Sequence, residues 1–201
     1  MKRARVVPAA AVMLMLGGCA QMQEMMGGGS EWRNLLANGV AGFSNVGEAN
    51  WRMTDGAVVA DKGIGYLVTR DTYGDFEMRA EVYAETDTNS GFFVRCNDTQ
   101  KITAANCYEV NIWDARPAPE YGTGAIVDHA KVNPMPKAGG KWNTFHVTMK
   151  GDHLVVVFNG QKTVDIRDAK HKSGVIALQH AKGVKDDLQP VKFRKVEIRK
   201  L

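Results

Sequence analysis

The sequence lacks most of the features that assign a protein to a class at sight. It has three cysteines, and no two of them have the Cys-x-x-Cys spacing of a zinc knuckle. No internal repeat at solenoid or propeller spacing is visible, and no stretch carries the apolar period of a helix of normal length. These absences argue against a repeat array, a helical bundle and a cysteine-based zinc module.

An excess of one charge is also missing. The chain has 26 lysines and arginines against 22 aspartates and glutamates. Three of the basic residues, Lys2, Arg3 and Arg5, lie in an N-terminal segment that is predicted to be removed, which leaves 23 basic against 22 acidic residues. A nearly neutral mature chain has no electrostatic basis for binding nucleic acid, so we expect no nucleic-acid partner.

The N-terminus has the order of an export signal. A positive head precedes an apolar run, residues 6–16, that is too short to span a bilayer. Small residues then lead to Cys19 in the stretch Leu16-Gly17-Gly18-Cys19, an ending that resembles a bacterial lipoprotein signal. The resemblance implies a signal peptide over residues 1–18, cleavage before Cys19 and a lipid on its thiol, as against an ordinary secretory signal with a chance cysteine.

The residues after Cys19 indicate the place of the mature chain in the cell. Ala20 resembles the sorting residue of outer-membrane lipoproteins, which implies a periplasm-facing domain held in the bacterial cell envelope by its lipid. Residues 19–31 have no periodic apolar face and include a Gly-Gly-Gly-Ser run, which is typical of a flexible tether. Residues 32–201 are then one large domain.

Export also decides what the two remaining cysteines do. Cys96 and Cys107 would meet an oxidising compartment, so a disulfide between them is predicted, with metal binding as the less favoured alternative. Closing a loop of this length stabilises a fold by on the order of 2 to 3 kcal/mol in the chain-entropy model. The bridge would hold the bases of two strands in one register.

Alternation of apolar and polar side chains dominates the rest of the chain. Residues 75–85 place apolar side chains on one face and charged ones on the other, as in a half-buried strand. Residues 142–150 and 153–158 pair across Gly151-Asp152, which sets Phe145 opposite Phe158. Asn159-Gly160 and Asp55-Gly56 supply further two-residue turns. Without helices the sheet must cover itself, so an all-β sandwich is predicted.

Ten short motifs, in this order, resemble the DUF1080 family, also called the 3-keto-disaccharide hydrolase domain. Their order and spacing carry the resemblance, which covers residues 32–201. The motifs are WRNLL (32–36), WRMTDG (51–56), YLVT (66–69), YGDFE (73–77), NSGFFVR (89–95), YEVNIWD (108–114), TGAI (123–126), KWN (141–143), FNG (158–160) and GVIALQ (174–179).

The resemblance implies a fold and a chemistry. The fold is a concanavalin A-like jelly roll, two antiparallel sheets with sugar held on a concave face. The chemistry is cleavage of a glycoside oxidised to a ketone at carbon 3, where a base removes the acidified hydrogen of carbon 2 and the oxygen on carbon 1 leaves. Such a site needs a base, a cation or metal beside the enolate oxygen and an acid for the leaving group.

Glu109 and Arg95 match motif positions of the family and flank the predicted disulfide. We expect Glu109 to be the base or a metal ligand, and Arg95 to bind the oxyanion or a substrate hydroxyl. A Glu–Arg ion pair that only braces the sheet is the alternative. If the cysteines pair directly, the two side chains lie on opposite faces of the hairpin, and a bulge or a one-residue stagger would bring them together.

Further candidates lie close to these two residues in the sequence or in the family pattern. Asn111 and Trp113 share the strand parity of Glu109 and are expected to bind substrate, although Trp113 also suits core packing. Asp114 begins a proline-rich rim and would bind sugar hydroxyls or cap the following turn. His180 is the third catalytic candidate, in a stretch that departs from the Asp-His-Gly pattern of the family.

The sequence therefore predicts a lipid-anchored β-sandwich that binds carbohydrate and cleaves a 3-keto glycoside. A non-catalytic carbohydrate-binding or envelope lipoprotein is the alternative. A conventional glucanase fits less well because no strand carries a cluster of carboxylates. No cofactor is implied with certainty, and the sequence leaves open whether a divalent metal ion takes part.

Overall fold

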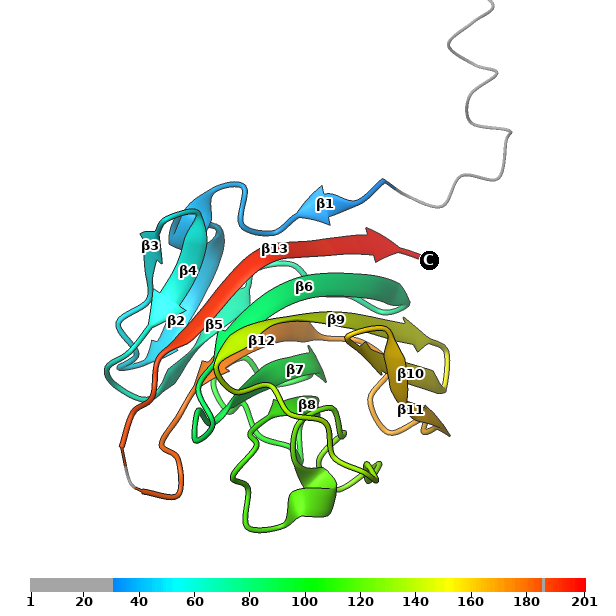
Figure 1. Cartoon of the computed structure of the whole chain (residues 1–201). Helices are drawn as coiled ribbons and strands as arrows, with labels where there is room; N and C mark the ends of the chain where they lie inside the picture. Colours follow the sequence, from blue (N-terminus) through cyan, green and yellow to red (C-terminus); the bar gives the residue numbers. More distant parts are fainter. Residues whose placement is uncertain (1–30, 186) are drawn as a thin grey trace, which may run out of the picture.

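A computed structural model describes residues 31–185 and 187–201, and its regular structure is almost entirely β (Figure 1). No helix in this part of the chain is long and apolar enough to cross a membrane. The predicted signal peptide, Cys19 and most of the tether lie outside the described residues. The strands are β1 Arg33–Asn34, β2 Phe43–Gly47, β3 Arg52–Thr54, β4 Ala57–Ala60, β5 Gly65–Thr69, β6 Phe76–Ala84, β7 Ser90–Cys96, β8 Tyr108–Ile112, β9 Lys141–Lys150, β10 His153–Phe158, β11 Gln161–Arg167, β12 Val175–His180 and β13 Val191–Lys200, with 3-10 turns η1 Gly39–Gly42 and η2 Pro119–Tyr121.

Two antiparallel sheets pack face to face. The larger sheet has eight strands in the order β11-β10-β9-β6-β13-β4-β3, with β1 added to β13, and the smaller has five in the order β2-β5-β12-β7-β8. In Figure 1 the long, curved strands of the larger sheet arch over the smaller one. This is the concanavalin A-like sandwich expected from the sequence.

The hairpins form as their turn residues predict. Phe145 lies opposite Phe158 in the β9–β10 pair, so both apolar sets face the core. Asn159 and Gly160 have φ values of 48° and 81°, the left-handed backbone that a tight hairpin turn needs. The strands expected at 75–85 and 142–150 begin or end within one residue of β6 and β9.

Apolar side chains from the facing sides of both sheets make one core. Phe92 of β7 packs edge-to-face against Phe145 of β9 and Phe193 of β13, with both pairs of ring centroids 5.5 Å apart. These pairs join the two sheets at their centre, so each strand has a fixed inner face. Side chains of the opposite parity point away from the sandwich.

The free edge of β8 is covered by the segment that follows it. The amide of Asn111 donates to the carbonyl of Ala125, and the amide of Val127 donates to the carbonyl of Glu109, both at 3.0 Å. The segment from Trp113 to Gly140 thus returns along β8 before the chain enters β9. It builds a rim below the smaller sheet in Figure 1.

The predicted disulfide joins Cys96 to Cys107 and is confirmed. The strands it connects are staggered: Phe93 lies opposite Glu109 and Val94 opposite Tyr108. Beyond Val94 the pairing of β7 with β12 shifts, and Arg95 has a φ of 53°. This bulge turns the Arg95 side chain to the inner side of the sheet, although its number has the parity of Phe93.

Arg95 is fully buried and binds backbone from three separate segments. Its Nε donates to the carbonyl of Gly74 at 2.8 Å, and Nη1 donates to the carbonyls of Gly151 at 2.8 Å and His171 at 3.1 Å. Nη2 donates to Asp75 Oδ1 at 3.1 Å. The guanidinium therefore ties β7 to the β9–β10 turn and to the segments before β6 and β12.

Replacing Arg95 by methionine should remove this link and leave the carbonyl oxygens of Gly74, Gly151 and the buried His171 without its donors. We expect Arg95→Met to lower the free energy of unfolding by about 3 to 5 kcal/mol, because the partners of a buried cation lose it together. Chemical denaturation measures the change. Arg167→Met, which breaks an exposed ion pair with Asp152, is the control and should cost no more than about 1 kcal/mol. Equal losses of unfolding free energy in the two variants would show that Arg95 stabilises the fold no more than an exposed ion pair does.

Candidate functional site

Polar side chains gather on the face of the smaller sheet that points away from the sandwich, called here the outer face. The strand registers arrange this face in two rows that run across β5, β12, β7 and β8. One row is Val68, Ala177, Phe93 and Glu109, and the other is Tyr66, Gln179, Gly91 and Asn111. The Tyr66 and Phe93 rings contact each other edge-to-face at 5.3 Å. The rows place one carboxyl, two amides and one phenol on the same surface.

Gly91 leaves room between the two amides. It lies opposite Asn111, and a Cβ at this position would come within 2.9 Å of the Val110 carbonyl oxygen. A larger residue would have to move the backbone of β8 or β7. The same Cβ would lie 3.7 Å from Glu109 Cγ, so glycine at this position lets the Glu109 side chain lie against the backbone of β7.

Two amide oxygens on this face have no hydrogen-bond partner among the described residues. They are Asn111 Oδ1 and Gln179 Oε1, and both are buried. The Asn111 amide nitrogen is held by the carbonyl of Tyr121 at 2.7 Å, which fixes the side chain. Buried polar atoms are nearly always paired, so two free acceptors on one surface point to a ligand that carries donors.

Glu109 is the most perturbed acid of this face. It is 8% exposed and accepts no direct hydrogen bond from the described residues. Burial raises the pKa of Glu109 to about 7; the nearby charge of Arg116 opposes the shift and that of Asp128 adds to it. A carboxyl with such a pKa can take up and release a proton near neutral pH.

Tyr66 and Arg116 flank this carboxyl. Burial raises the pKa of Tyr66, and the charge of Glu109 adds to the rise, so the phenol keeps its proton. Gln179 Nε2 donates to the Tyr66 hydroxyl at 3.5 Å, while the hydroxyl proton meets no acceptor among the described residues. The Nε of Arg116 is likewise buried without a partner. Both groups are donors available to a ligand.

Trp113 and its contacts close one end of the outer face. The indole Nε1 donates to Asp87 Oδ1 at 3.0 Å, and the Arg116 guanidinium lies 5.7 Å from the centre of the Trp113 ring. Asp87 also accepts from the amides of Val184 and Lys185. These contacts join the rim after β8 to the loop before β13 and hold Arg116 towards the site.

Asp114 has a structural task in this rim. Its carboxylate accepts from the Thr123 hydroxyl at 2.7 Å and from the amides of Ala138 and Gly139 at 2.9 Å. These bonds fasten the two ends of the rim segment to each other. These partners lie well beyond the turn that directly follows Asp114, so the contacts show neither the capping of that turn nor the binding of a sugar hydroxyl.

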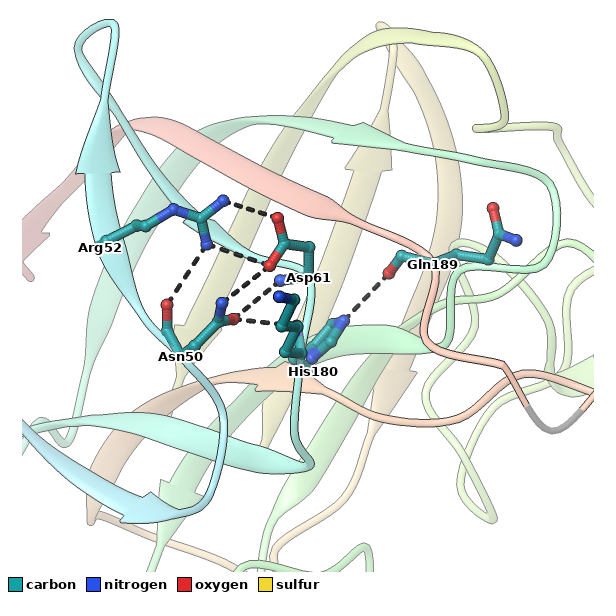
Figure 2. Close-up of polar contacts among 6 residues, drawn as sticks. Asn50, Arg52, Asp61, His180 and Gln189 are labelled. Atoms are coloured by element: carbon teal, nitrogen blue, oxygen red, sulfur yellow. Dashed lines mark hydrogen bonds and ion pairs between the residues drawn. The ribbon is translucent and has the colours of Figure 1, made fainter.

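His180 lies inside the sandwich. It is fully buried at the end of β12, with Nδ1 2.7 Å from the Gly63 carbonyl oxygen and Nε2 3.0 Å from the Gln189 carbonyl oxygen. Figure 2 shows it next to the network in which Asp61 accepts from Asn50 and Arg52. With both ring nitrogens facing backbone, the imidazole joins two loops and does not face the outer surface.

Of the six candidates from the sequence, Glu109 and Asn111 meet on the outer face and Trp113 adjoins it. Arg95 and His180 point into the sandwich, so their positions give no support to the catalytic roles predicted for them. The cation beside Glu109 is Arg116. Tyr66, Gln179 and Arg116 were missed, although Tyr66 and Gln179 lie in family-like motifs and alternate with core residues along β5 and β12.

The described residues contain no group of three or more histidine, cysteine, aspartate or glutamate side chains that could hold a metal ion. The acceptors on the outer face are oxygens: the Glu109 carboxylate and the unpaired amide oxygens of Asn111 and, across β7, Gln179. Oxygen donors suit a hard divalent cation such as Ca²⁺ or Mg²⁺, and sugar hydroxyl groups would satisfy them equally.

The model of the 3-keto-alpha-glucoside-1,2-lyase-like domain matches residues 31–199, so the chain belongs to this family. This confirms the resemblance found in the sequence motifs. No curated protein matches the chain.

Solved structures agree on the fold. A candidate glycosyl hydrolase from Parabacteroides distasonis ATCC 8503 is 24% identical, with a TM-score of 0.71, and the match covers 85% of this chain and 100% of that one. Carbohydrate-binding module CBM66 from Bacillus subtilis is 17% identical, with a TM-score of 0.60, over 79% and 95% of the two chains. A galectin-like protein from the same species is 9% identical, with a TM-score of 0.63, over 85% and 94%.

The raised pKa of Glu109 predicts a pH-dependent stability. The folded state holds this proton more tightly than the unfolded state, whose pKa is near 4.5. The stabilisation is full below pH 4.5 and is lost as the pH rises through about 7. A shift of this size corresponds to about 3 kcal/mol of unfolding free energy.

Glu109→Gln should therefore gain stability relative to the unmodified protein as the pH rises from about 5 to 8, measured by denaturant unfolding at each pH. The matched control is Glu120→Gln on η2, which also removes one carboxylate but lies outside the site. A difference between Glu109→Gln and the unmodified protein that does not change with pH would contradict the raised pKa.

Proposed function

We propose that the outer face of the smaller sheet binds a carbohydrate and cleaves a glycoside oxidised to a ketone at carbon 3. The observation that carries this proposal is the buried Glu109 carboxyl, whose pKa of about 7 suits a general base at neutral pH. The family name adds the reaction class, since its members are described as 3-keto-alpha-glucoside-1,2-lyase-like.

The reaction follows from the acidity of the sugar. A ketone at carbon 3 acidifies the hydrogen on carbon 2, and Glu109 takes that proton. The electron pair of the C–H bond passes into an enolate and then expels the glycosidic oxygen from carbon 1, leaving a double bond between carbons 1 and 2. The departing oxygen takes up a proton, and water added across the double bond completes a hydrolysis.

The neighbours of Glu109 have the properties that these steps need. Arg116 brings a positive charge to the Glu109 side of the face and has a free Nε donor, which suits the developing enolate oxygen. The Tyr66 hydroxyl is a protonated donor without an acceptor, which suits the departing oxygen. Asn111 and Gln179 offer acceptors that would orient sugar hydroxyls.

A divalent cation fits the same donors. Glu109, Asn111 and Gln179 would hold it through oxygen atoms, and it would polarise the ketone of a bound sugar. In that case Glu109 would be a ligand and another group would have to serve as the base. Removal of metal by a chelator distinguishes the two assignments.

Carbohydrate binding without cleavage is the second candidate. Two neighbours of the fold favour it: the module CBM66 and the lumenal domain of VIP36 in a form with Ca²⁺ and mannose, which has a TM-score of 0.53 at 11% identity. The outer face would then hold a sugar through the same free donors and acceptors. The raised pKa of Glu109 is what favours the enzyme.

The N-terminal sequence supports a lipid anchor on Cys19, which would hold the domain at the outer membrane, facing the periplasm. The prediction is that the mature protein starts at Cys19 and that its N-terminal peptide carries lipid mass. Mass spectrometry of the protein from bacterial membranes measures both. A mature protein that starts elsewhere, or Cys19→Ser protein that stays in the membrane fraction, would contradict the anchor.

Turnover of a 3-keto glucoside and of its unoxidised parent tests the function. We expect cleavage of the ketone alone, and we expect Glu109→Gln to lower kcat by about a hundredfold or more, the usual contribution of a general base. The rate of the unmodified enzyme should rise with pH up to about 7, as Glu109 loses its proton.

Glu120→Gln is the control and should keep full activity. Cleavage of the unoxidised parent would indicate a glycosidase of the two-carboxylate type. Binding of the sugar without turnover would support the non-catalytic alternative. An active Glu109→Gln enzyme would remove Glu109 from the reaction.

A further inference from the structure

The larger sheet carries a groove on its own outer face, on the side of the sandwich opposite to Glu109. Its volume is about 570 Å³, and it crosses β10, β9, β6 and β13. This volume is within the range of ligand sites in proteins. The walls combine apolar surface with polar side chains, and the polar ones are Arg79, Glu81, Thr144, His146, Lys195 and Glu197.

Each carboxylate of this groove is less exposed than the cation with which it pairs. Lys195 and Glu81 form an ion pair in which the lysine side chain is 66% exposed and the glutamate 18%. Arg79 and Glu197 form another, with 51% and 25% exposed. Because the cation is the more exposed member of each pair, a ligand that enters the groove meets positive charge first.

Tryptophan rings fix several of the arginines around the groove. The guanidiniums of Arg79 and Arg199 lie 4.3 Å and 4.9 Å from the centre of the Trp32 ring. Arg194, which also pairs with Glu81, lies 3.9 Å from the Trp142 ring. Stacking on an indole holds a guanidinium in one plane while its edge can still donate, which lowers the entropy lost when it binds a carboxylate.

We propose that this groove is a second binding site, for an acidic polysaccharide. The carboxylate groups of such a chain would pair with Lys195 and Arg79, while its hydroxyl groups would meet Thr144 and His146 on the floor. The site is independent of the Glu109 face, because it lies on the other sheet. It would keep the domain on a glycan matrix while the Glu109 face stays open.

The composition of the groove favours this ligand over other partners. The exposed large apolar side chains of the described residues, Met53, Ile64, Val184 and Leu201, do not line it, so an apolar protein or membrane contact is not favoured. The carboxylates Glu81 and Glu197 within the groove would repel the closely spaced phosphates of a nucleic acid. A chain with charges spaced by sugar rings avoids that repulsion.

Isothermal titration calorimetry of the purified domain with polygalacturonate, at low ionic strength, tests the proposal. We expect saturable binding that weakens as salt rises, because partly exposed charges are screened. The double variant Arg79→Gln/Lys195→Gln should lose about tenfold or more in affinity, as expected for the removal of two charge-assisted contacts.

Lys131→Gln is the matched control: its side chain is 63% exposed, it pairs with Glu120, and it lies on the rim of the other sheet. It should bind polygalacturonate as the unmodified protein does. Denaturant unfolding of each variant checks that it is folded. If the double variant does not fold, the single variant Lys195→Gln takes its place.

Three outcomes would overturn the proposal. They are no binding of polygalacturonate by the unmodified protein, unchanged affinity in the folded groove variant, and equal binding of polyglutamate or of the neutral glucan dextran. Equal binding of polyglutamate would indicate a general polyanion surface, and equal binding of dextran would indicate that charge is not recognised.

Discussion

The pairing of β7 with β8 is the constraint on which the rest of the site depends. The Cys96–Cys107 disulfide closes the loop between the two strands, and the stagger that sets Phe93 opposite Glu109 fixes the face on which each later side chain lies. A slip of one residue would turn Glu109 into the core. The bulge at Arg95 then sends the one fully buried arginine of the described residues inwards, where it holds three segments together.

This arrangement separates stability from chemistry within one hairpin. The inner side carries Arg95, which donates four hydrogen bonds to three carbonyl oxygens and Asp75. The outer side carries Glu109, which is 8% exposed, and Asn111, whose buried amide oxygen is unpaired among the described residues. A buried cation that is hydrogen-bonded to several segments holds them together. A buried acid without hydrogen-bond donors is destabilising by itself, and its pKa is raised. The packing of the surrounding strands offsets the unfavourable burial of the Glu109 carboxyl.

The two outer faces of the sandwich differ in the same physical terms. On the smaller sheet the polar groups are few, buried and unpaired, which suits a small, hydroxyl-rich ligand held close to Glu109. On the larger sheet they are many, exposed and already paired, and the indoles of Trp32 and Trp142 order the cations. The two proposals therefore assign polymer binding to one face and sugar cleavage to the other.

The sequence by itself determined the strands at 75–85, 142–150 and 153–158, the turns at Asn159-Gly160 and Asp55-Gly56, the disulfide and the family. Alternation, turn chemistry and cysteine count are local properties. It also placed Glu109 and Asn111 on one side of their strand. Only the tertiary structure decided that Arg95 and His180 face inwards and that Arg116 and Tyr66 accompany Glu109. A bulge, a register and a loop return depend on contacts between residues far apart in the chain, and the pattern along one strand does not contain them.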